Sequence, residues 1–393
     1  MPPRIAHVRA LVVRGGGADY HDQRGAHWID DHIATPMARY PEYRQSRRSF
    51  GIDVLGTLVV EVEADDGTVG FAVTAGGEPA AWVVEHHLAR FLEGASAEDV
   101  ERIWDQMYLS TIFYGRRGVV LNAISGVDLA VWDLLGRLRD EPVHALIGPA
   151  VRDEIVFYAT GPRPDLAHKL GFIGGKLPLH HAPDKGADGL ARNLEQLSTM
   201  RARVGDDFWL MWDCWMSLDV EYAAHLVGEA ADLGLKWLEE PLLPDDYWGH
   251  GELRRRMPAA TLLAAGEHEA TRWGFRLLAE MGQVDILQPD VGWCGGLTEL
   301  LRVSAFAEGH DKLVVPHGSS VYSYHFAVTS RTTPFSEFIM MHPEAREIVP
   351  MFSPLLTGEP LPESGRLRTS ALDRPGFGVE LDEGTRLDRP FPH

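Results

Sequence analysis

The sequence predicts an α/β fold in which a parallel (β/α) barrel follows a smaller α+β domain. From residue 155 onward, short apolar runs of strand character alternate with helical patterns, and about eight such units indicate a closed barrel. Three acidic residues in this region end successive predicted strands and are separated by about 27 residues, the length of one strand, one helix and two loops. The 393 residues, 45% of them hydrophobic, are enough for a barrel and a second domain.

The charge balance limits the partners that we expect. There are 37 basic and 57 acidic residues, and the net charge of −20 disfavours nucleic acids and anionic membranes. Two cysteines, Cys214 and Cys294, cannot form a disulfide framework and fit a reducing cytoplasm. No long apolar run follows the basic start of the chain, so neither a signal peptide nor a membrane span is expected. We therefore expect a cytoplasmic protein that acts on a small molecule.

The N-terminal part reads as an α+β domain over residues 1–148. A strand is predicted at residues 5–13, and a hairpin at 56–63 and 69–74 is indicated by the turn Asp65-Asp66-Gly67. Helical patterns follow at residues 79–92, 97–108 and 119–138. Between the first strand and the hairpin lies a long polar and aromatic loop at about residues 15–51. A loop of this length is usually functional or disordered, and its Trp, Tyr and His residues argue against disorder.

The barrel is predicted over residues 149–345, after a segment rich in Gly and Pro at 136–149. The tail, residues 346–393, is rich in Pro and Gly and is expected to pack on the N-terminal domain. The predicted strands are 155–160, 172–178, 208–213, 236–239, 261–266, 284–289, 313–316 and 337–341. The helices that we expect between them include 190–204, 220–233, 274–281 and 297–309. The eighth unit is expected to be slightly irregular.

The three acidic residues at the strand ends are Asp213, Glu239 and Glu267. In a closed parallel barrel they converge at one mouth, and hard oxygen ligands gathered in this way suit Mg²⁺. A single such residue is more simply explained as a cap of the following helix. Three of them in consecutive units favour a shared metal ion.

The next two strands end at Asp290 and His317. Neighbouring strands can bring these residues side by side, and a carboxylate that accepts a hydrogen bond from one imidazole nitrogen raises the basicity of the other. The alternative is a histidine that only caps the turn at residues 318–320. Beside a metal site, a His base suits removal of the α-proton of a carboxylate substrate, because a divalent cation stabilises the ene-diolate that develops.

These residues, in this order, resemble the mandelate racemase subgroup of the enolase superfamily. More narrowly, four stretches resemble the L-rhamnonate dehydratase family, and the similarity runs nearly end to end. The four stretches are residues 17–23 (GADYHDQ), 27–37 (HWIDDHIATPM), 288–296 (QPDVGWCGG) and 314–322 (VVPHGSSVY).

The resemblance implies a modified TIM barrel covered by a capping domain that is formed from the N-terminal region and the C-terminal tail. It implies Mg²⁺ on the three strand-end carboxylates, His317 as the base with Asp290 behind it, and a homo-oligomer. It also implies that His21 and Arg47 bind the substrate and that Glu337 helps to hold its carboxylate end. From the residues alone, Arg47 is more simply explained as a solvated member of the cluster Arg44, Arg47 and Arg48, although a guanidinium can pair with a carboxylate in two hydrogen bonds.

One departure from the subgroup concerns the second predicted barrel strand. Many relatives carry Lys-X-Lys there and so place a second base on the opposite face of the substrate, but this chain reads Lys176-Leu177-Pro178. Racemisation needs bases on both faces, so the sequence argues against a racemase. Lys176 remains a candidate substrate ligand. A dehydratase can use one residue, and the hypothesis is that His317 removes the C2 proton and then protonates the departing C3 hydroxyl.

The function that we predict is a Mg²⁺-dependent hydro-lyase that converts L-rhamnonate to 2-keto-3-deoxy-L-rhamnonate and water. Alternatives are a dehydratase of L-mannonate or L-lyxonate, and a sugar-acid-binding barrel without catalysis, which the Asp290–His317 pair disfavours. A phosphate-binding barrel has only the faint signal of residues 318–320. Four tryptophans near the strand ends are assigned to barrel packing rather than to the substrate. They are Trp212, Trp215, Trp237 and Trp293.

Overall fold

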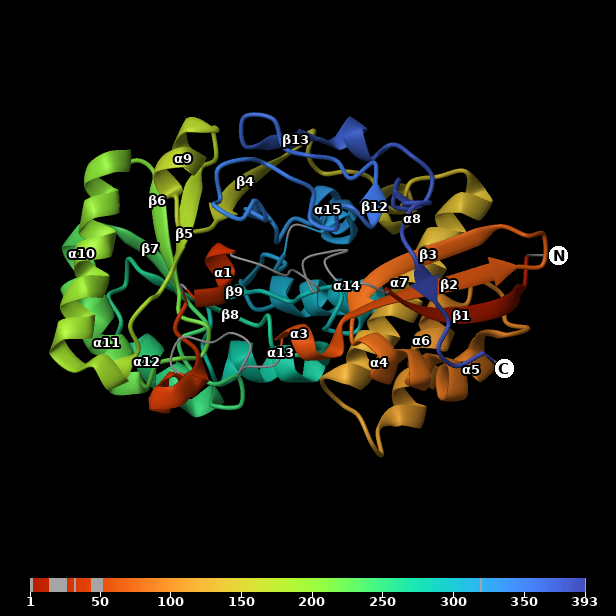
Figure 1. The fold of residues 1–393 in the computed structure, drawn as a ribbon, viewed down its shortest axis with the longest axis horizontal. Helices are drawn as coiled ribbons and strands as arrows, with labels where there is room; N and C mark the ends of the chain where they lie inside the picture. The colour runs from red at the N-terminus through yellow and green to blue at the C-terminus, as the bar shows by residue number, and fades with distance from the viewer. Residues whose placement is uncertain (1–2, 14–26, 32, 44–51, 319, 393) are drawn as a thin grey trace.

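The computed structural model describes residues 3–13, 27–31, 33–43, 52–318 and 320–392. Two bodies lie side by side in Figure 1, a barrel and a capping domain, and the long helix α7 lies at their junction. The predicted fold class, a (β/α) barrel with an α+β cap built from both ends of the chain, is confirmed.

The cap is built on a four-stranded antiparallel sheet in the order β15-β1-β2-β3. Its strands are β1 (Ile5–Val13), β2 (Thr57–Ala64), β3 (Val69–Ala75) and β15 (Leu387–Asp388). Short helical turns precede β2, at α1 (Trp28–Asp31), Pro36–Arg39, Pro41–Tyr43 and α3 (Ile52–Leu55). The cap helices are α4 (Gly77–Val83), α5 (Ala89–Leu92), α6 (Val100–Thr111), α7 (Val119–Arg139) and α8 (Val143–Ile147).

The segment predicted as one helix over residues 79–92 contains a π-helical turn at Val84–Leu88 between α4 and α5. This turn includes Glu85, whose carboxylate accepts a hydrogen bond from the backbone N–H of Ala10 at 2.9 Å. Helix α7 is, among the described residues, the one helix long and apolar enough to cross a membrane, but 89% of that stretch is buried inside the protein. It is therefore the core helix of the cap, packed on β2 and β3.

The barrel contains eight parallel strands in the order β10-β9-β8-β7-β6-β5-β4-β11. The strands are β4 (Glu154–Thr160), β5 (Gly174–Pro178), β6 (Trp209–Asp213), β7 (Leu235–Glu239), β8 (Leu262–Ala265), β9 (Ile286–Leu287), β10 (Leu313–Val314) and β11 (Ser336–Ile339). The helices between them are α9 (Pro164–Lys169), α10 (Gly186–Val204), α11 (Val220–Glu229), α12 (Tyr247–Arg256), α13 (Thr271–Glu280), α14 (Gly296–Glu308) and α15 (Val321–Thr329).

The barrel is irregular where β10 meets β11. No ladder joins these two strands in the described sheet, and Val314 instead bonds to the segment before β11, through Thr332 (3.0 Å) and the Thr333 hydroxyl (2.7 Å). Strands β9 and β10 are only two residues long, because the prolines that follow have no N–H for a regular ladder. The pairing nevertheless continues as an isolated bridge between Asp290 and His317, so both residues stay at the barrel mouth.

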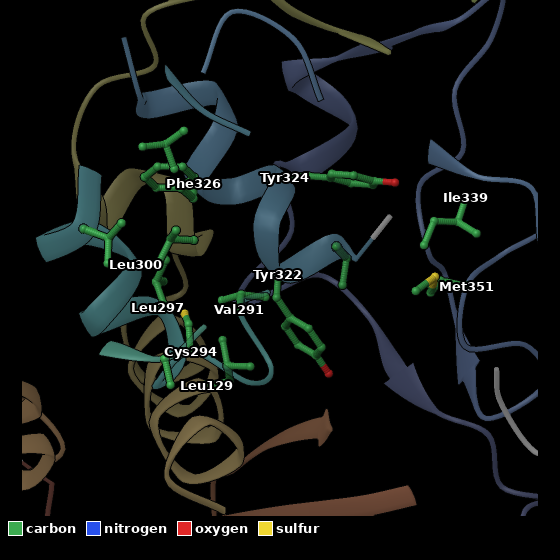
Figure 2. Packing of buried hydrophobic residues seen from close by; sticks show 14 of the residues in the cluster. Leu129, Val291, Cys294, Leu297, Leu300, Tyr322, Tyr324, Phe326, Ile339 and Met351 are labelled. Carbon is green, nitrogen blue, oxygen red and sulfur yellow. The ribbon is translucent and has the colours of Figure 1, made fainter. Parts of the chain in front are cut away.

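The cap is joined to the barrel by hydrophobic packing and by buried polar contacts. Figure 2 shows Leu129 of α7 beside Cys294 and Leu297 at the start of α14. The Tyr322 hydroxyl of α15 accepts a hydrogen bond from the backbone N–H of Val73 in β3, at 2.9 Å. The cap is therefore fixed on the side of the barrel that carries β9 and β10.

The C-terminal tail contacts both bodies. Strand β15 pairs with β1 of the cap, whereas β13 (Arg366–Arg368) pairs antiparallel with β4 of the barrel. Strands β12 (Leu356–Thr357) and β14 (Glu380–Leu381) pair with each other. Near the end of the chain, the Arg389 guanidinium donates two hydrogen bonds, at 2.7 and 2.8 Å, to the buried Glu85 carboxylate. The tail thus joins β1 of the cap sheet to the π-helical turn of the cap that contains Glu85.

A buried histidine between barrel and tail gives a testable pH dependence of stability. Nδ1 of His325 accepts a hydrogen bond from the backbone N–H of His144 (3.0 Å), and Nε2 lies 3.3 Å from the carbonyl of Phe377. Burial and the neighbouring His144 lower the pKa of His325 to about 3. The folded state therefore favours the neutral ring, and stability is lost as pH falls from about 6.5 toward 3.

We expect the wild type to lose about 2 kcal/mol more unfolding free energy than His325→Asn between pH 7 and pH 5. Urea unfolding at each pH would measure it. His225→Asn, at a side chain that is 62% exposed, is the matched control and should follow the wild type. Parallel pH profiles for the wild type and His325→Asn would contradict the prediction.

Candidate active site

Three carboxylates meet at the carboxyl ends of neighbouring strands. Asp213 and Glu239 are the last residues of β6 and β7, and Glu267 lies two residues beyond β8. Their ligand oxygens all lie within 4.8 Å of one another, and all three residues are buried. Gly266 has φ +135°, a conformation that L side chains rarely adopt, and a Cβ there would lie 2.7 Å from Phe275. The glycine therefore permits the turn that carries Glu267 into the site.

The carboxylates are held by donors from the barrel interior. The indole N–H of Trp215 donates to Glu267 at 2.8 Å, and that of Trp237 donates to Glu239 at 3.0 Å. The amide of Gln288 also donates to Glu239, at 2.7 Å. Each of these bonds engages one oxygen and leaves the direction of the carboxylate fixed, which is how ligands of a metal ion are oriented by their neighbours.

One buried lysine faces this acidic group. Nζ of Lys176, on β5, contacts Glu239, lies 2.8 Å from Glu337 and lies 3.8 Å from Asp213. Burial, outweighed by these carboxylates, leaves the pKa of Lys176 well above its ordinary value. The lysine thus stays charged and is engaged by the acids. Its predicted contact with the substrate stays a prediction.

The residues present fit a hard divalent cation. Burial and repulsion from the other carboxylates raise the pKa of Asp213, and burial raises that of Glu239 to about 7, with Lys176 opposing both shifts. The single lysine therefore does not balance the negative charge gathered here. A divalent cation bound by the three oxygen ligands would balance it, and an all-carboxylate set suits Mg²⁺ rather than a thiolate-preferring metal.

His317 and Asp290 form the pair that the strand ends predicted. Nδ1 of His317 lies 2.8 Å from Oδ2 of Asp290, and Nε2 lies 3.4 Å from Oε2 of Glu267. Because Asp290 accepts the Nδ1 proton, Nε2 is the nitrogen turned toward the carboxylate cluster. Burial disfavours the charged ring, but Glu267 and Asp290 outweigh it and hold the pKa of His317 well above its ordinary value.

Glu337, on β11, is held as an anion by the protein itself. Its carboxylate accepts hydrogen bonds from the Thr160 hydroxyl and from the backbone N–H of Gly318 (2.8 Å), and it pairs with Lys176. Burial would raise the pKa of Glu337, but Lys176 and His317 lower it to about 2. Its predicted role at the carboxylate end of the substrate stays a prediction.

A cavity of about 330 Å³ opens on these residues. Sequence reasoning assigned Trp215 and Trp293 to barrel packing, and this was wrong, because both line the cavity. Trp212 and Trp237 are fully buried in the barrel as expected. The cavity is lined from the barrel by Thr160, Lys176, Asp213, Trp215, Glu267, His268, Glu269, Ala270, Trp293, His317, Glu337, Ile339 and Met341, and from the N-terminal part by Trp28, Ile29, Ile33, Leu55, Ala75, Gly118, Val119 and Asn122.

Sequence reasoning missed His268 and Asn122, which line the cavity. The His268 ring lies between those of Trp215 and Trp293, at centroid distances of 6.1 and 6.0 Å. Its position directly after Glu267 was a signal that could have found it. The two predicted substrate ligands of the N-terminal loop, His21 and Arg47, lie outside the described residues, and their roles stay predictions.

A capped barrel that gathers acidic groups and a histidine at its strand ends is an enolase-type architecture, and two family models agree. The model described as the mandelate racemase/muconate lactonizing enzyme N-terminal domain matches residues 51–148, and the one described as enolase C-terminal domain-like matches residues 167–385. The chain belongs to the mandelate racemase/muconate lactonizing enzyme family, within the enolase superfamily.

Solved structures show which members of the family this chain resembles. A rhamnonate dehydratase from Gibberella zeae complexed with Mg is 47% identical, with a TM-score of 0.95 over 97% of this chain and 94% of that one. A second structure of L-rhamnonate dehydratase from the same organism is 46% identical, with a TM-score of 0.92 over the same shares. A 3,6-anhydro-D-galactonate cycloisomerase from Zobellia galactanivorans is 26% identical, with a TM-score of 0.75 over 96% of this chain and 97% of that one. The resemblance to L-rhamnonate dehydratases is confirmed.

Proposed function

We propose that the protein is a Mg²⁺-dependent sugar-acid dehydratase that converts L-rhamnonate to 2-keto-3-deoxy-L-rhamnonate and water. The observation that carries the proposal is the oriented His317, which lines the cavity and places Nε2 3.4 Å from Glu267, one of the three carboxylates. The similarity to Mg-complexed rhamnonate dehydratase from Gibberella zeae supports the cation and the substrate class. Asp213, Glu239 and Glu267 are the residues that would hold Mg²⁺.

In the proposed reaction, His317 acts twice. With a cation on Glu267, the carboxylate that most favours the charged ring would be balanced, and neutral Nε2 would take the proton from C2. Asp290 stabilises the imidazolium by accepting a hydrogen bond from Nδ1–H, at 2.8 Å. When bound, Mg²⁺ supplies positive charge beside the substrate carboxylate, where negative charge develops. The imidazolium then returns the proton to the C3 hydroxyl as the C3–O bond breaks, and water leaves. The enol that remains tautomerises to the 2-keto acid.

The opposite face of the substrate has no free base at the end of β5. Pro178 stands where the family resemblance places a second lysine, and Nζ of Lys176 is engaged by the carboxylates of Glu239 and Glu337. This arrangement supports dehydration by one histidine and disfavours racemisation.

The cavity has several apolar residues in its lining, and these support a substrate with an apolar end. Its lining from the N-terminal part includes Ile29, Ile33, Leu55 and Val119, and Met341 joins them from the barrel. L-Rhamnonate ends in a methyl group, whereas L-mannonate carries a hydroxyl there. An apolar wall rejects an added hydroxyl only moderately, by about 100-fold at most. We therefore place L-rhamnonate first and L-mannonate second.

Val119→Thr tests this wall. It places a hydroxyl there at nearly constant volume, so the ratio of kcat/KM for L-rhamnonate over L-mannonate should fall about tenfold. Steady-state kinetics with both acids would measure the ratio. Val54→Thr, at an exposed position beside the wall, is the control and should leave the ratio unchanged. An unchanged ratio in Val119→Thr would remove Val119 from the specificity wall.

The proposed function is tested by incubating the protein with a panel of sugar acids and Mg²⁺ and measuring 2-keto acid formation. We expect turnover of L-rhamnonate that stops when a chelator removes the cation. Turnover of no sugar acid would refute the dehydratase, and binding of L-rhamnonate without turnover would favour the non-catalytic alternative. We also propose that the protein forms a homo-oligomer. Analytical ultracentrifugation would measure the mass of that assembly.

A further inference from the structure

A single arginine of the cap contacts the barrel loops that follow both β7 and β8. Arg117 lies between α6 and α7, and its guanidinium donates to the Asp245 carboxylate and to the Tyr247 hydroxyl, both after β7. The same Nη2 atom lies 3.1 and 3.2 Å from the two carboxylate oxygens of Glu269, after β8. Three segments that are distant in sequence are therefore joined at one side chain.

The Glu269 carboxylate at the centre of this junction is fully buried. It accepts hydrogen bonds from the Tyr247 hydroxyl at 2.5 Å and from the backbone N–H of Ala270 at 2.7 Å. A Cβ at Gly274 would lie 2.2 Å from its Cδ, so the glycine in α13 leaves the space that this carboxylate fills. A buried charge of this kind is costly unless it is paired, and Arg117 is the cation that pairs with it.

The junction lies next to the proposed metal ligands. Glu269 is two residues beyond Glu267, and the loop between β8 and α13 is also fixed from the β7 side, because Glu240 accepts a hydrogen bond from Gly266 N at 2.6 Å. Glu240 directly follows Glu239. The loops that carry two of the three ligands are thus bonded to each other and, through Arg117, to the cap.

The same arginine also places the cap wall of the cavity. Gly118 and Val119, which directly follow Arg117, line the cavity together with Glu269. Movement of the arginine would therefore shift the wall that faces the substrate and the loop that bears Glu267 at the same time.

We propose that Arg117 is a positioning residue. Through Glu269 and Tyr247, it couples the position of the cap on the barrel to the geometry of the metal site. The inference rests on the proposed function only in assigning Glu239 and Glu267 as ligands. Arg117 touches neither the reacting atoms nor the ligand oxygens, and it acts by fixing the two loops that carry them. Removing partners that orient ligands typically lowers metal affinity by 10- to 100-fold.

The test is Mn²⁺ binding, measured by electron paramagnetic resonance without any sugar acid, in the wild type and in Arg117→Ala. We expect a 10- to 100-fold weaker affinity in the variant, together with a higher KM for L-rhamnonate. Arg139→Ala removes another cap arginine, whose partner Glu98 lies 2.7 Å away on the surface, and it should bind Mn²⁺ as the wild type does. Equal affinity in Arg117→Ala and Arg139→Ala would overturn the inference.

Tyr247→Phe keeps the test decisive if Arg117→Ala does not fold. It removes one hydroxyl from the junction but leaves Glu269 paired with Arg117, so we expect a folded protein with a slightly lower Tm and a smaller but measurable loss of Mn²⁺ affinity. Wild-type affinity in Tyr247→Phe would then overturn the coupling. If the wild type itself binds no Mn²⁺, the ligand assignment is wrong and the inference is overturned with it. If the wild type binds Mn²⁺ and the junction variants bind it equally well, only the inference about Arg117 is overturned and the ligand assignment stands.

Discussion

Replacing His317 with asparagine is expected to lower kcat for L-rhamnonate by about 1000-fold. Asparagine retains a polar group near Asp290 but has no nitrogen that can take the C2 proton or return it to the C3 hydroxyl. The ligand oxygens of Asp213, Glu239 and Glu267 remain in place, so the loss should appear in turnover rather than in cation binding. Steady-state kinetics and Mn²⁺ titration would measure the two effects.

The matched variant is Asp290→Asn, which leaves the imidazole and removes the charge that orients it at 2.8 Å. We expect a smaller loss in that variant, about 100-fold, because the base remains but the imidazolium is less stabilised. Exchange of the C2 hydrogen with deuterium oxide should disappear in His317→Asn. Full activity in His317→Asn would show that another residue is the base.

Asp213→Asn is expected to abolish turnover and, at the same time, to stabilise the protein when no metal is bound. The pKa of Asp213 is raised by burial and by the neighbouring carboxylates, so its ionised form destabilises the folded state at neutral pH. The neutral side chain can still accept the 3.1 Å hydrogen bond from Trp215 N. The gain should grow as pH rises above about 3.9, where the unfolded carboxyl ionises.

Thermal unfolding with and without Mg²⁺ would measure both effects. At a cation concentration 100 times its Kd, the wild type should gain about 2.7 kcal/mol of unfolding free energy, and Asp213→Asn should gain almost none. Asp232→Asn, at an exposed position, is the control and should respond to Mg²⁺ as the wild type does. A destabilised metal-free Asp213→Asn would contradict the prediction and would indicate that attraction between the ionised carboxylate and Lys176, 3.8 Å away, outweighs its burial.

The centre of the site could be predicted from the sequence because the barrel repeats. In a parallel barrel, the residue that ends each strand reaches the same mouth, so the spacing of Asp213, Glu239 and Glu267 was enough to bring them together. The structure places their oxygens within 4.8 Å of one another. The same rule brought Asp290 beside His317, even though their strands are only two residues long.

The periphery of the site could not be predicted in this way. Trp215 and Trp293 looked like packing residues. The sequence does not show whether a tryptophan just after a strand packs inside the barrel or lines the cavity at its mouth. Arg117 lies 152 positions from Glu269, in a connection with no repeat to set its register. The pairing of β13 with β4 was missed for the same reason, since a three-residue strand in a tail rich in Pro and Gly has little periodicity.

Because the tail contributes to the cap, the cap cannot be completed in the order in which the chain is synthesised. Strand β1 is near the start of the chain, yet its neighbour β15 follows the whole barrel, and the same is true of Arg389 and its partner Glu85. During synthesis, the end of β1 at Val12 and Val13 therefore stays unpaired until the barrel and β15 have been made. An unpaired strand end can join another chain, so we infer that this part of the cap is most exposed to aggregation before β15 has been made.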